Sequence, residues 1–96
     1  MRLLLTNRSK KDIENIVYWY DYQRKGLGFD FFDSLENAFS QISQFPESYP
    51  VVYQNFRRCL LKRFPYSIFY LIEDQQLVVH AVLNHRQDVG KSVNLL

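Results

Sequence analysis

The feature that most constrains the fold is a run of three alternating apolar segments between residues 56 and 85. Residues 66–73 place Tyr, Ile, Tyr and Ile on one face of an extended chain and Ser, Phe and Leu on the other. Residues 77–83 alternate in the same way, and Asp74-Gln75 between them is the expected hairpin tip, although it has no glycine. Aromatic and β-branched residues on both faces favour a central strand. The run therefore predicts three consecutive antiparallel strands.

The alternation assigns each side chain of the last strand to a face. One face is expected to carry Leu77, Val79, Ala81 and Leu83, and the other Val78, His80 and Val82. Because His80 lies inside an apolar strand, we expect it to be packed or half-buried.

The first of the three strands carries a concentration of positive charge. Its four basic residues are Arg57, Arg58, Lys62 and Arg63. No acidic residue occurs between Glu47 and Glu73. Alternation places Arg58 and Lys62 on one face and Arg57 and Arg63 on the other. A cationic strand of this kind indicates an anionic partner, either nucleic acid or an acidic protein segment. The alternative is a sheet edge that charge protects from aggregation.

Length and charge limit what the chain can be. Its 96 residues predict a single domain, 1–96, with one modest core, and 47% hydrophobic residues exclude a disordered chain. The net charge of +2 is too small to indicate a nucleic-acid partner by itself. Residues 1–50 hold 6 basic and 7 acidic groups, whereas residues 51–96 hold 6 basic and 3 acidic groups. The positive field therefore belongs to the strand-rich half.

The sequence predicts neither a metal site nor a cofactor. Cys59 is the single cysteine, which excludes an internal disulfide and is compatible with a reducing cytoplasm. We expect it to be a small buried hydrophobe. Two histidines and one cysteine have no metal-ligand spacing, and three glycines form no phosphate-binding loop. The apolar start at residues 3–5 is too short for a secretory signal, and no run is long enough to span a membrane. We therefore expect a cytoplasmic protein.

The first half of the chain predicts a short strand followed by two helices. Residues 2–6 are the strand, and Ser9 is the expected N-cap of the first helix, with Asp12 in capping-box position. Gly26 is expected to end this helix. Its inner face is expected to carry Ile13, Ile16, Val17 and Tyr20.

The second helix is expected over residues 29–44. Its inner stripe is predicted to consist of Phe32, Leu35, Phe39 and Ile42. The short link between the helices predicts an antiparallel hairpin. The order is then β-α-α-β-β-β, an α+β fold in which a helical hairpin packs on one face of a four-stranded, mainly antiparallel sheet.

The first helix carries more aromatic residues than its predicted inner face can bury. Tyr18, Trp19 and Tyr22 widen the apolar surface. At helical spacing such residues most often belong to the core. The alternative is a surface on which a partner helix docks or two copies pair.

These landmarks together resemble the RelE/ParE family of bacterial type II toxins. The resemblance covers nearly the whole chain, and its most specific part is the run from Arg57 to Tyr70 with Gly26-Leu27-Gly28-Phe29 upstream. Further landmarks are Asp12-Ile13, Tyr18-Trp19-Tyr20, Phe45-Pro46, Tyr49-Pro50, Ala81-Val82-Leu83 and His85-Arg86. The resemblance implies a small cytoplasmic, growth-inhibiting toxin that a cognate antitoxin neutralises by wrapping its helices and sheet. A toxin dimer or a heterotetramer with the antitoxin is compatible with this.

Two mechanisms divide the family, and the resemblance implies different residues for each. RelE-like members cut mRNA in the ribosome with a cluster of basic residues and a C-terminal Tyr. Arg58 and Arg86 match that pattern, and His85 is the candidate general acid or base, although a structural or phosphate-contacting role is favoured for it. Leu60 and Ser67 stand where a Lys and an Arg are expected, and the tail after Arg86 has no Tyr. Loss of such charge-stabilising groups costs about 10²-fold or more in rate each.

We therefore favour the ParE-like branch, whose members poison DNA gyrase and carry out no known chemistry. On that interpretation the target-binding residues are Arg57, Arg58, Lys62, Arg63 and Arg86, and the antitoxin-binding residues are Trp19 and Tyr22. The alternatives are a RelE-like mRNA endoribonuclease and an inactive or orphan member that binds nucleic acid or protein. Phosphate contacts from the basic strand would make nucleic-acid binding strongly salt-dependent.

Overall fold

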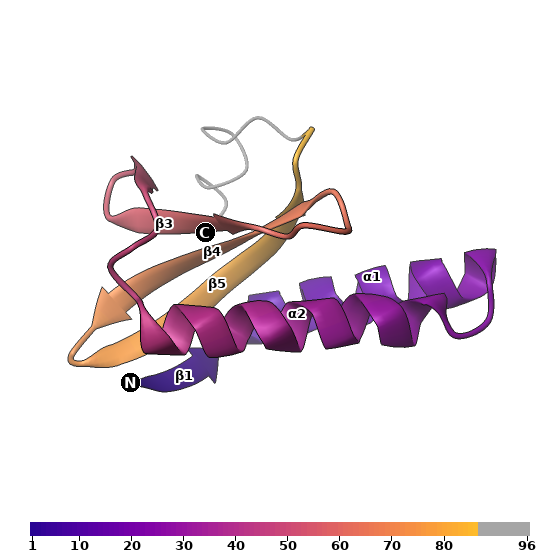
Figure 1. The fold of residues 1–96 in the computed structure, drawn as a ribbon, viewed down its shortest axis with the longest axis horizontal. Coiled ribbons are helices and arrows are strands. Elements are labelled where there is room, and N and C mark those ends of the chain that lie inside the picture. Colours follow the sequence, from indigo (N-terminus) through magenta and orange to yellow (C-terminus); the bar gives the residue numbers. More distant parts are fainter. Residues whose placement is uncertain (87–96) are drawn as a thin grey trace.

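The computed structural model describes residues 1–86, and the predicted tail at 87–96 lies outside the described residues. A sheet forms one layer and two antiparallel helices the other (Figure 1). The elements are β1 (Arg2–Leu5), α1 (Asn7–Gln23), α2 (Leu27–Gln44), β2 (Val51–Tyr53), β3 (Phe56–Leu60), β4 (Tyr66–Glu73) and β5 (Gln76–Asn84). The turn end of the helical hairpin extends beyond the sheet (Figure 1).

The sheet has five strands in the order β1-β5-β4-β3-β2, one more than predicted. β1 pairs parallel with β5, and the other pairs are antiparallel. The unpredicted strand is β2, which pairs Val51 with Arg57 and Tyr53 with Phe56. Three residues are too few to show a period of two, which is why the pattern missed this strand.

The N-cap of α1 is Thr6, not Ser9. The Thr6 Oγ1 accepts the Ser9 N–H at 3.1 Å, and the Ser9 hydroxyl donates to the Thr6 carbonyl at 2.9 Å. The Asp12 carboxylate has a different partner from the one predicted: its Oδ2 accepts the Val82 N–H of β5 at 3.0 Å. Burial raises the pKa of Asp12, while the Val82 bond and the nearby Arg8 oppose that rise. Asp12 therefore ties α1 to the sheet.

The link between the helices is tighter than predicted, because α2 begins at Leu27 rather than at residue 29. Gly26 has φ of +90°, a conformation that favours glycine, and it is the N-cap of α2. The Gly28 N–H donates to Asp21 Oδ1 at 2.9 Å. A Cβ at Gly28 would lie 2.6 Å from the Val17 carbonyl oxygen, so glycine permits the close approach of the two helices.

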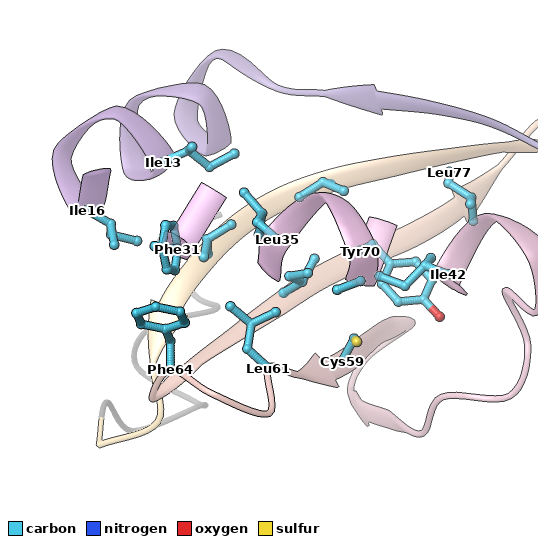
Figure 2. Close-up of a cluster of buried hydrophobic side chains, with 14 of the residues drawn as sticks. Ile13, Ile16, Phe31, Leu35, Ile42, Cys59, Leu61, Phe64, Tyr70 and Leu77 are labelled. Carbon is cyan, nitrogen blue, oxygen red and sulfur yellow. The ribbon is translucent and has the colours of Figure 1, made fainter. Parts of the chain in front are cut away.

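The main core lies between the helical hairpin and the sheet. Figure 2 shows Phe31, Leu35 and Ile42 of α2 among side chains from α1 and the strands. The predicted inner face of α1 is confirmed for Ile13, Ile16 and Tyr20. In α2 the buried stripe is Phe31, Leu35, Ala38 and Ile42, whereas Phe32 is 42% exposed. The prediction was thus right for Leu35 and Ile42. Phe31 and Ala38 are buried in place of Phe32 and Phe39, because adjacent positions fit the helical spacing almost equally well.

The β4–β5 hairpin is confirmed, but its register contains a bulge. Asp74 and Gln75 have φ of 49° and 62°, the left-handed pair that a tight hairpin turn needs. Tyr70 pairs with Val79 and Phe69 with Ala81, so His80 is an extra residue in β5. A bulge reverses which face the following residues occupy. Ala81 and Leu83 therefore pack with Phe56 and Phe69 on the sheet face away from the helices, contrary to the predicted alternation.

Candidate functional site

The four predicted basic residues lie in three different settings. Arg57 is half-buried, and its Nη1 donates to the backbone carbonyls of Glu47 at 3.1 Å and Tyr49 at 2.6 Å. These bonds hold the loop after α2 against β3. The Arg57 guanidinium is therefore engaged inside the fold, a role that the positive charge of the strand did not indicate.

Arg58 lies on the sheet face away from the helices. It is half-buried, pairs across the strands with Phe69, and its N–H donates to the Pro50 carbonyl at 3.0 Å. Phe69 in turn pairs with Ala81. Arg58 thus stands beside the second apolar cluster, which consists of Phe56, Phe69, Ala81 and Leu83.

Lys62 and Arg63 do not share strand faces with Arg58 and Arg57 as predicted, because β3 ends at Leu60. Both are exposed in the turn between β3 and β4. The Arg63 guanidinium lies 5.6 Å from the centre of the Phe64 ring, within reach of a cation–π contact. Phe64 is buried against Tyr20 and Phe31, so the turn that carries these two cations is anchored to the core.

His85 and Arg86 follow β5 and are both exposed. The His85 N–H donates to the Pro65 carbonyl at 2.8 Å, and its ring Nε2 lies 2.8 Å from the Tyr66 carbonyl. A carbonyl accepts only, so Nε2 carries the hydrogen. The ring therefore holds the end of β5 to the start of β4, and its Nδ1 is the nitrogen free to accept a proton in the neutral form.

Leu60 and Ser67, the two residues that depart from the RelE-like pattern, are neighbours in the sheet. Leu60 pairs with Ser67, and Ser67 pairs with Leu83. This cross-strand row lies next to the row that contains Arg58 on the same face. Ser67 is only 2% exposed and Leu83 only 6%. The place where two further cations would flank Arg58 is thus occupied by one hydroxyl and two apolar side chains.

His80 is half-buried, as expected. Its ring meets the Phe56 ring edge-on at 5.4 Å between centroids, and its Nε2 lies 3.9 Å from Glu73 Oε2. That separation is too long for a hydrogen bond. His80 therefore acts as a packing residue at the bulge.

Neither a metal site nor an activated thiol is present in the described part of the chain. Residues 1–86 contain no group of three or more His, Cys, Asp and Glu side chains that could hold a metal ion. Cys59 is 3% exposed, and burial raises the pKa of its thiol. A protonated, buried thiol is a poor nucleophile.

The surplus aromatic residues are exposed around the turn of the helical hairpin. Tyr18 is 77% exposed, Trp19 54%, Tyr22 81% and Phe29 71%. Tyr20 between them is buried and stacks on Phe31. Trp19 and Tyr22 are the two residues predicted to bind an antitoxin. The Trp19 ring makes an edge-on contact with Tyr20, and Tyr22 is the more exposed of the two.

The available cations of the site, called the cationic rim below, lie at three places: on the sheet face away from the helices, in the β3–β4 turn and after β5. Arg58, Lys62, Arg63 and Arg86 are the cations available to an anionic group on a partner. Within the described residues, no helix is both long and apolar enough to cross a membrane. Within residues 1–86, the side chains next to Arg58 on this face are those of Phe56, Phe69 and the row Leu60–Ser67–Leu83.

Comparison with known proteins places this geometry in context. The family model described as the ParE toxin of the type II toxin–antitoxin system parDE matches residues 3–89. A structure of the chromosomal ParDE system of Pseudomonas aeruginosa superposes with a TM-score of 0.68 at 13% identity, covering 88% of this chain and 95% of that one. The solution structure of a conserved hypothetical protein from Helicobacter pylori has a TM-score of 0.49 at 19% identity, over 91% of this chain and 97% of that one. No curated protein sequence matches the chain.

Proposed function

We propose that this chain, which belongs to the ParE family of type II toxin–antitoxin toxins, inhibits growth by binding DNA gyrase rather than by cutting mRNA. The observation that carries the proposal is the row Leu60–Ser67–Leu83 beside Arg58. Cleavage of RNA develops negative charge on a phosphate, and stabilising that charge needs several donors close together. An apolar row in that place favours a toxin that acts by occupying a protein surface.

The target-binding surface in this proposal is the cationic rim. Arg58 lies on the sheet face away from the helices, Lys62 and Arg63 are exposed in the β3–β4 turn, and Arg86 is exposed after β5. Charges at the rim of an interface mainly steer association and set its specificity. We assign Arg57 a structural part in this surface, because its guanidinium is bonded to the loop after α2.

The proposal is tested with purified toxin and purified gyrase. We expect the toxin to inhibit supercoiling and to raise the amount of linear plasmid released when trapped complexes are denatured. Arg58→Glu should weaken this inhibition, and the matched control Lys25→Glu, which reverses an exposed charge at the helical turn, should not. Gyrase unaffected by folded wild-type toxin would refute the proposed target.

A cognate antitoxin is the second partner in this proposal. We propose that it docks on the exposed aromatic side chains of α1, with Trp19 and Tyr22 as the anchors. Exposed aromatic residues of this size are typical of binding hot spots. The similar P. aeruginosa ParDE structure comes from a chromosomal toxin–antitoxin system.

Trp19→Ala tests the docking surface. Because the side chain is 54% exposed, its loss should weaken antitoxin binding about tenfold or more while the melting temperature changes little. Titration calorimetry and thermal unfolding of the same sample separate these effects. A fall in stability with antitoxin affinity unchanged would remove Trp19 from the docking surface.

A further inference from the structure

Two segments that are distant in the sequence meet at one end of the sheet, and both carry positive charge. Two cations lie in the β3–β4 turn, and a histidine and an arginine follow β5 (Figure 1). The His85 backbone N–H donates to the Pro65 carbonyl at 2.8 Å, and the His85 ring Nε2 lies 2.8 Å from the Tyr66 carbonyl. These bonds hold the two segments together. We call the four residues the end cluster: Lys62, Arg63, His85 and Arg86.

The core holds the β3–β4 turn in place. Phe64 is buried, and its ring meets the rings of Tyr20 and Phe31 edge-on at 5.1 and 5.4 Å between centroids. The Arg63 guanidinium in turn lies 5.6 Å from the centre of the Phe64 ring. A turn anchored in this way presents its cations already ordered, which lowers the entropy that a partner's binding must offset.

The cations of the end cluster are not neutralised within residues 1–86. There, Lys62, Arg63 and Arg86 form no ion pair, and all three are exposed. Asp33 is the acidic residue that lines the same groove as Lys62 and Arg63. The end cluster therefore has an excess of positive charge, which attracts an anionic partner.

The aromatic rings next to the end cluster are committed to packing. Phe64 is buried, and the ring of the half-buried Tyr66 meets Tyr20 and Phe31 edge-on at 6.2 and 5.5 Å between centroids. Proteins that bind single-stranded nucleic acid stack its bases on available aromatic rings. Cations without such rings suit phosphates, and duplex DNA carries one negative charge per about 1.7 Å of its axis. The end cluster therefore suits the backbone of a duplex.

We propose that the end cluster binds phosphates of double-stranded DNA. The proposal rests on the function proposed above, because the duplex in question is the one that gyrase holds. Lys62, Arg63 and Arg86 contact the phosphates, whereas His85 is a positioning residue that keeps the two segments together. Phosphate contacts fix the register of a protein on a duplex and carry no sequence information, so any base sequence serves. The toxin thus contacts gyrase while this end contacts the DNA.

The first test measures binding of the full chain to a short random-sequence DNA duplex by fluorescence anisotropy, without gyrase. We expect the logarithm of the affinity to fall with the logarithm of the salt concentration, by about 0.9 for each phosphate contact. Lys62→Gln with Arg63→Gln should weaken binding about tenfold or more and lower this slope by about 1.8. The matched control Arg24→Gln with Lys25→Gln removes the same charge from the exposed helical turn and should leave the slope unchanged.

Three results would overturn the proposal. The first is a folded wild-type toxin that does not bind the duplex, and the second is an equal loss of affinity in the two double variants. The third is tighter binding of a DNA single strand of the same length, or of a polyglutamate peptide, than of the duplex. Circular dichroism shows whether each variant is folded. If the turn variant is not, Arg86→Gln takes its place and should lower the slope by about 0.9.

Inhibition of gyrase, measured on the same samples, separates the DNA site from the proposed target. We expect the turn variant to need about tenfold more toxin than the wild type for the same inhibition of supercoiling, in line with its lost phosphate contacts. Duplex binding that depends on the end cluster, by a toxin that leaves gyrase active, would support the DNA site and refute gyrase as the target. Gyrase inhibition by a toxin that does not bind DNA would overturn the DNA site alone.

Discussion

At the scale of single residues, two adjacent arginines of β3 have different tasks. Arg57 turns toward the loop after α2 and satisfies two backbone carbonyls there, whereas Arg58 lies on the sheet face away from the helices. A side chain that closes a loop contributes to stability, and one on a binding face contributes mainly to recognition. If Arg58 binds the target as proposed, the pair separates folding from function within one strand.

We expect Arg57→Ala to lower the free energy of unfolding by about 1–2 kcal/mol, because two carbonyls lose a charged donor. Arg58→Ala, its neighbour, should change that free energy by less than about 0.5 kcal/mol. Urea denaturation followed by circular dichroism measures both. Equal losses of stability in the two variants would contradict the division of tasks.

Tyr70 is the residue whose titration should be visible in stability. It is fully buried, its hydroxyl donates to the Pro46 carbonyl at 2.6 Å, and burial raises its pKa from 10.0 to about 12. Below pH 10 the folded and unfolded chains both keep this proton. Between about pH 10 and 12 the unfolded chain loses it first, so stability falls as the pH rises through that window.

Tyr70→Phe should therefore cost about 1 kcal/mol at neutral pH through the lost hydrogen bond. The variant should then lose less stability than the wild type between pH 10 and 12. Denaturation curves at several alkaline pH values give the difference between the two proteins, which cancels the titration of the other tyrosines. If the free energies of unfolding of the two proteins fell equally between pH 10 and 12, the raised pKa of Tyr70 would be contradicted.

At the scale of elements, the helical hairpin depends on its glycine-rich turn. Gly28 lies inside the first turn of α2, where alanine would normally be the better helix former. Here a Cβ would lie 2.6 Å from the Val17 carbonyl and 2.8 Å from the Asp21 carboxylate. Because this clash involves backbone, alanine at position 28 is expected to lower the free energy of unfolding despite its higher helix propensity.

Gly28→Ala should destabilise the protein by about 1–3 kcal/mol, because the helices must separate. Gly26→Ala, at φ of +90° but with open space around it, should cost about 1 kcal/mol through backbone strain alone. Thermal unfolding of both variants compares a packing cost with a conformational one. A Gly28→Ala protein as stable as the wild type would contradict the close approach of α1 and α2.

The elements also show what a sequence pattern can and cannot predict. The helices, β4 and β5 follow from long periodic runs, and the order of all but β2 was predicted correctly. Residues in β5 beyond His80 were assigned to the wrong face, because a bulge is set by cross-strand pairing with β4 rather than by the local alternation. The Thr6 cap and the Asp12–Val82 bond depend likewise on tertiary contacts. For the site, the pattern identified the cations but could not show that Arg57 is bonded internally.

At the scale of the whole molecule, the two faces of the sheet carry different sets of buried side chains. The helix-covered face holds the main core, and the other face presents a smaller apolar cluster with Arg58 at its side. Among residues 1–86, Arg58 is flanked on this face by the row Leu60–Ser67–Leu83. This arrangement suits a toxin that binds a protein target.

The row Leu60–Ser67–Leu83, on the proposed function, leaves this toxin unable to cut RNA. The direct measurement is cleavage of a defined mRNA on programmed ribosomes by the purified toxin, with an active RelE-type toxin as the positive control. We expect intact mRNA at toxin concentrations that saturate cleavage by the control. Cleavage at a defined position in the ribosomal A-site codon, abolished by Arg58→Ala and Arg86→Ala, would contradict it and establish this chain as an mRNA endoribonuclease.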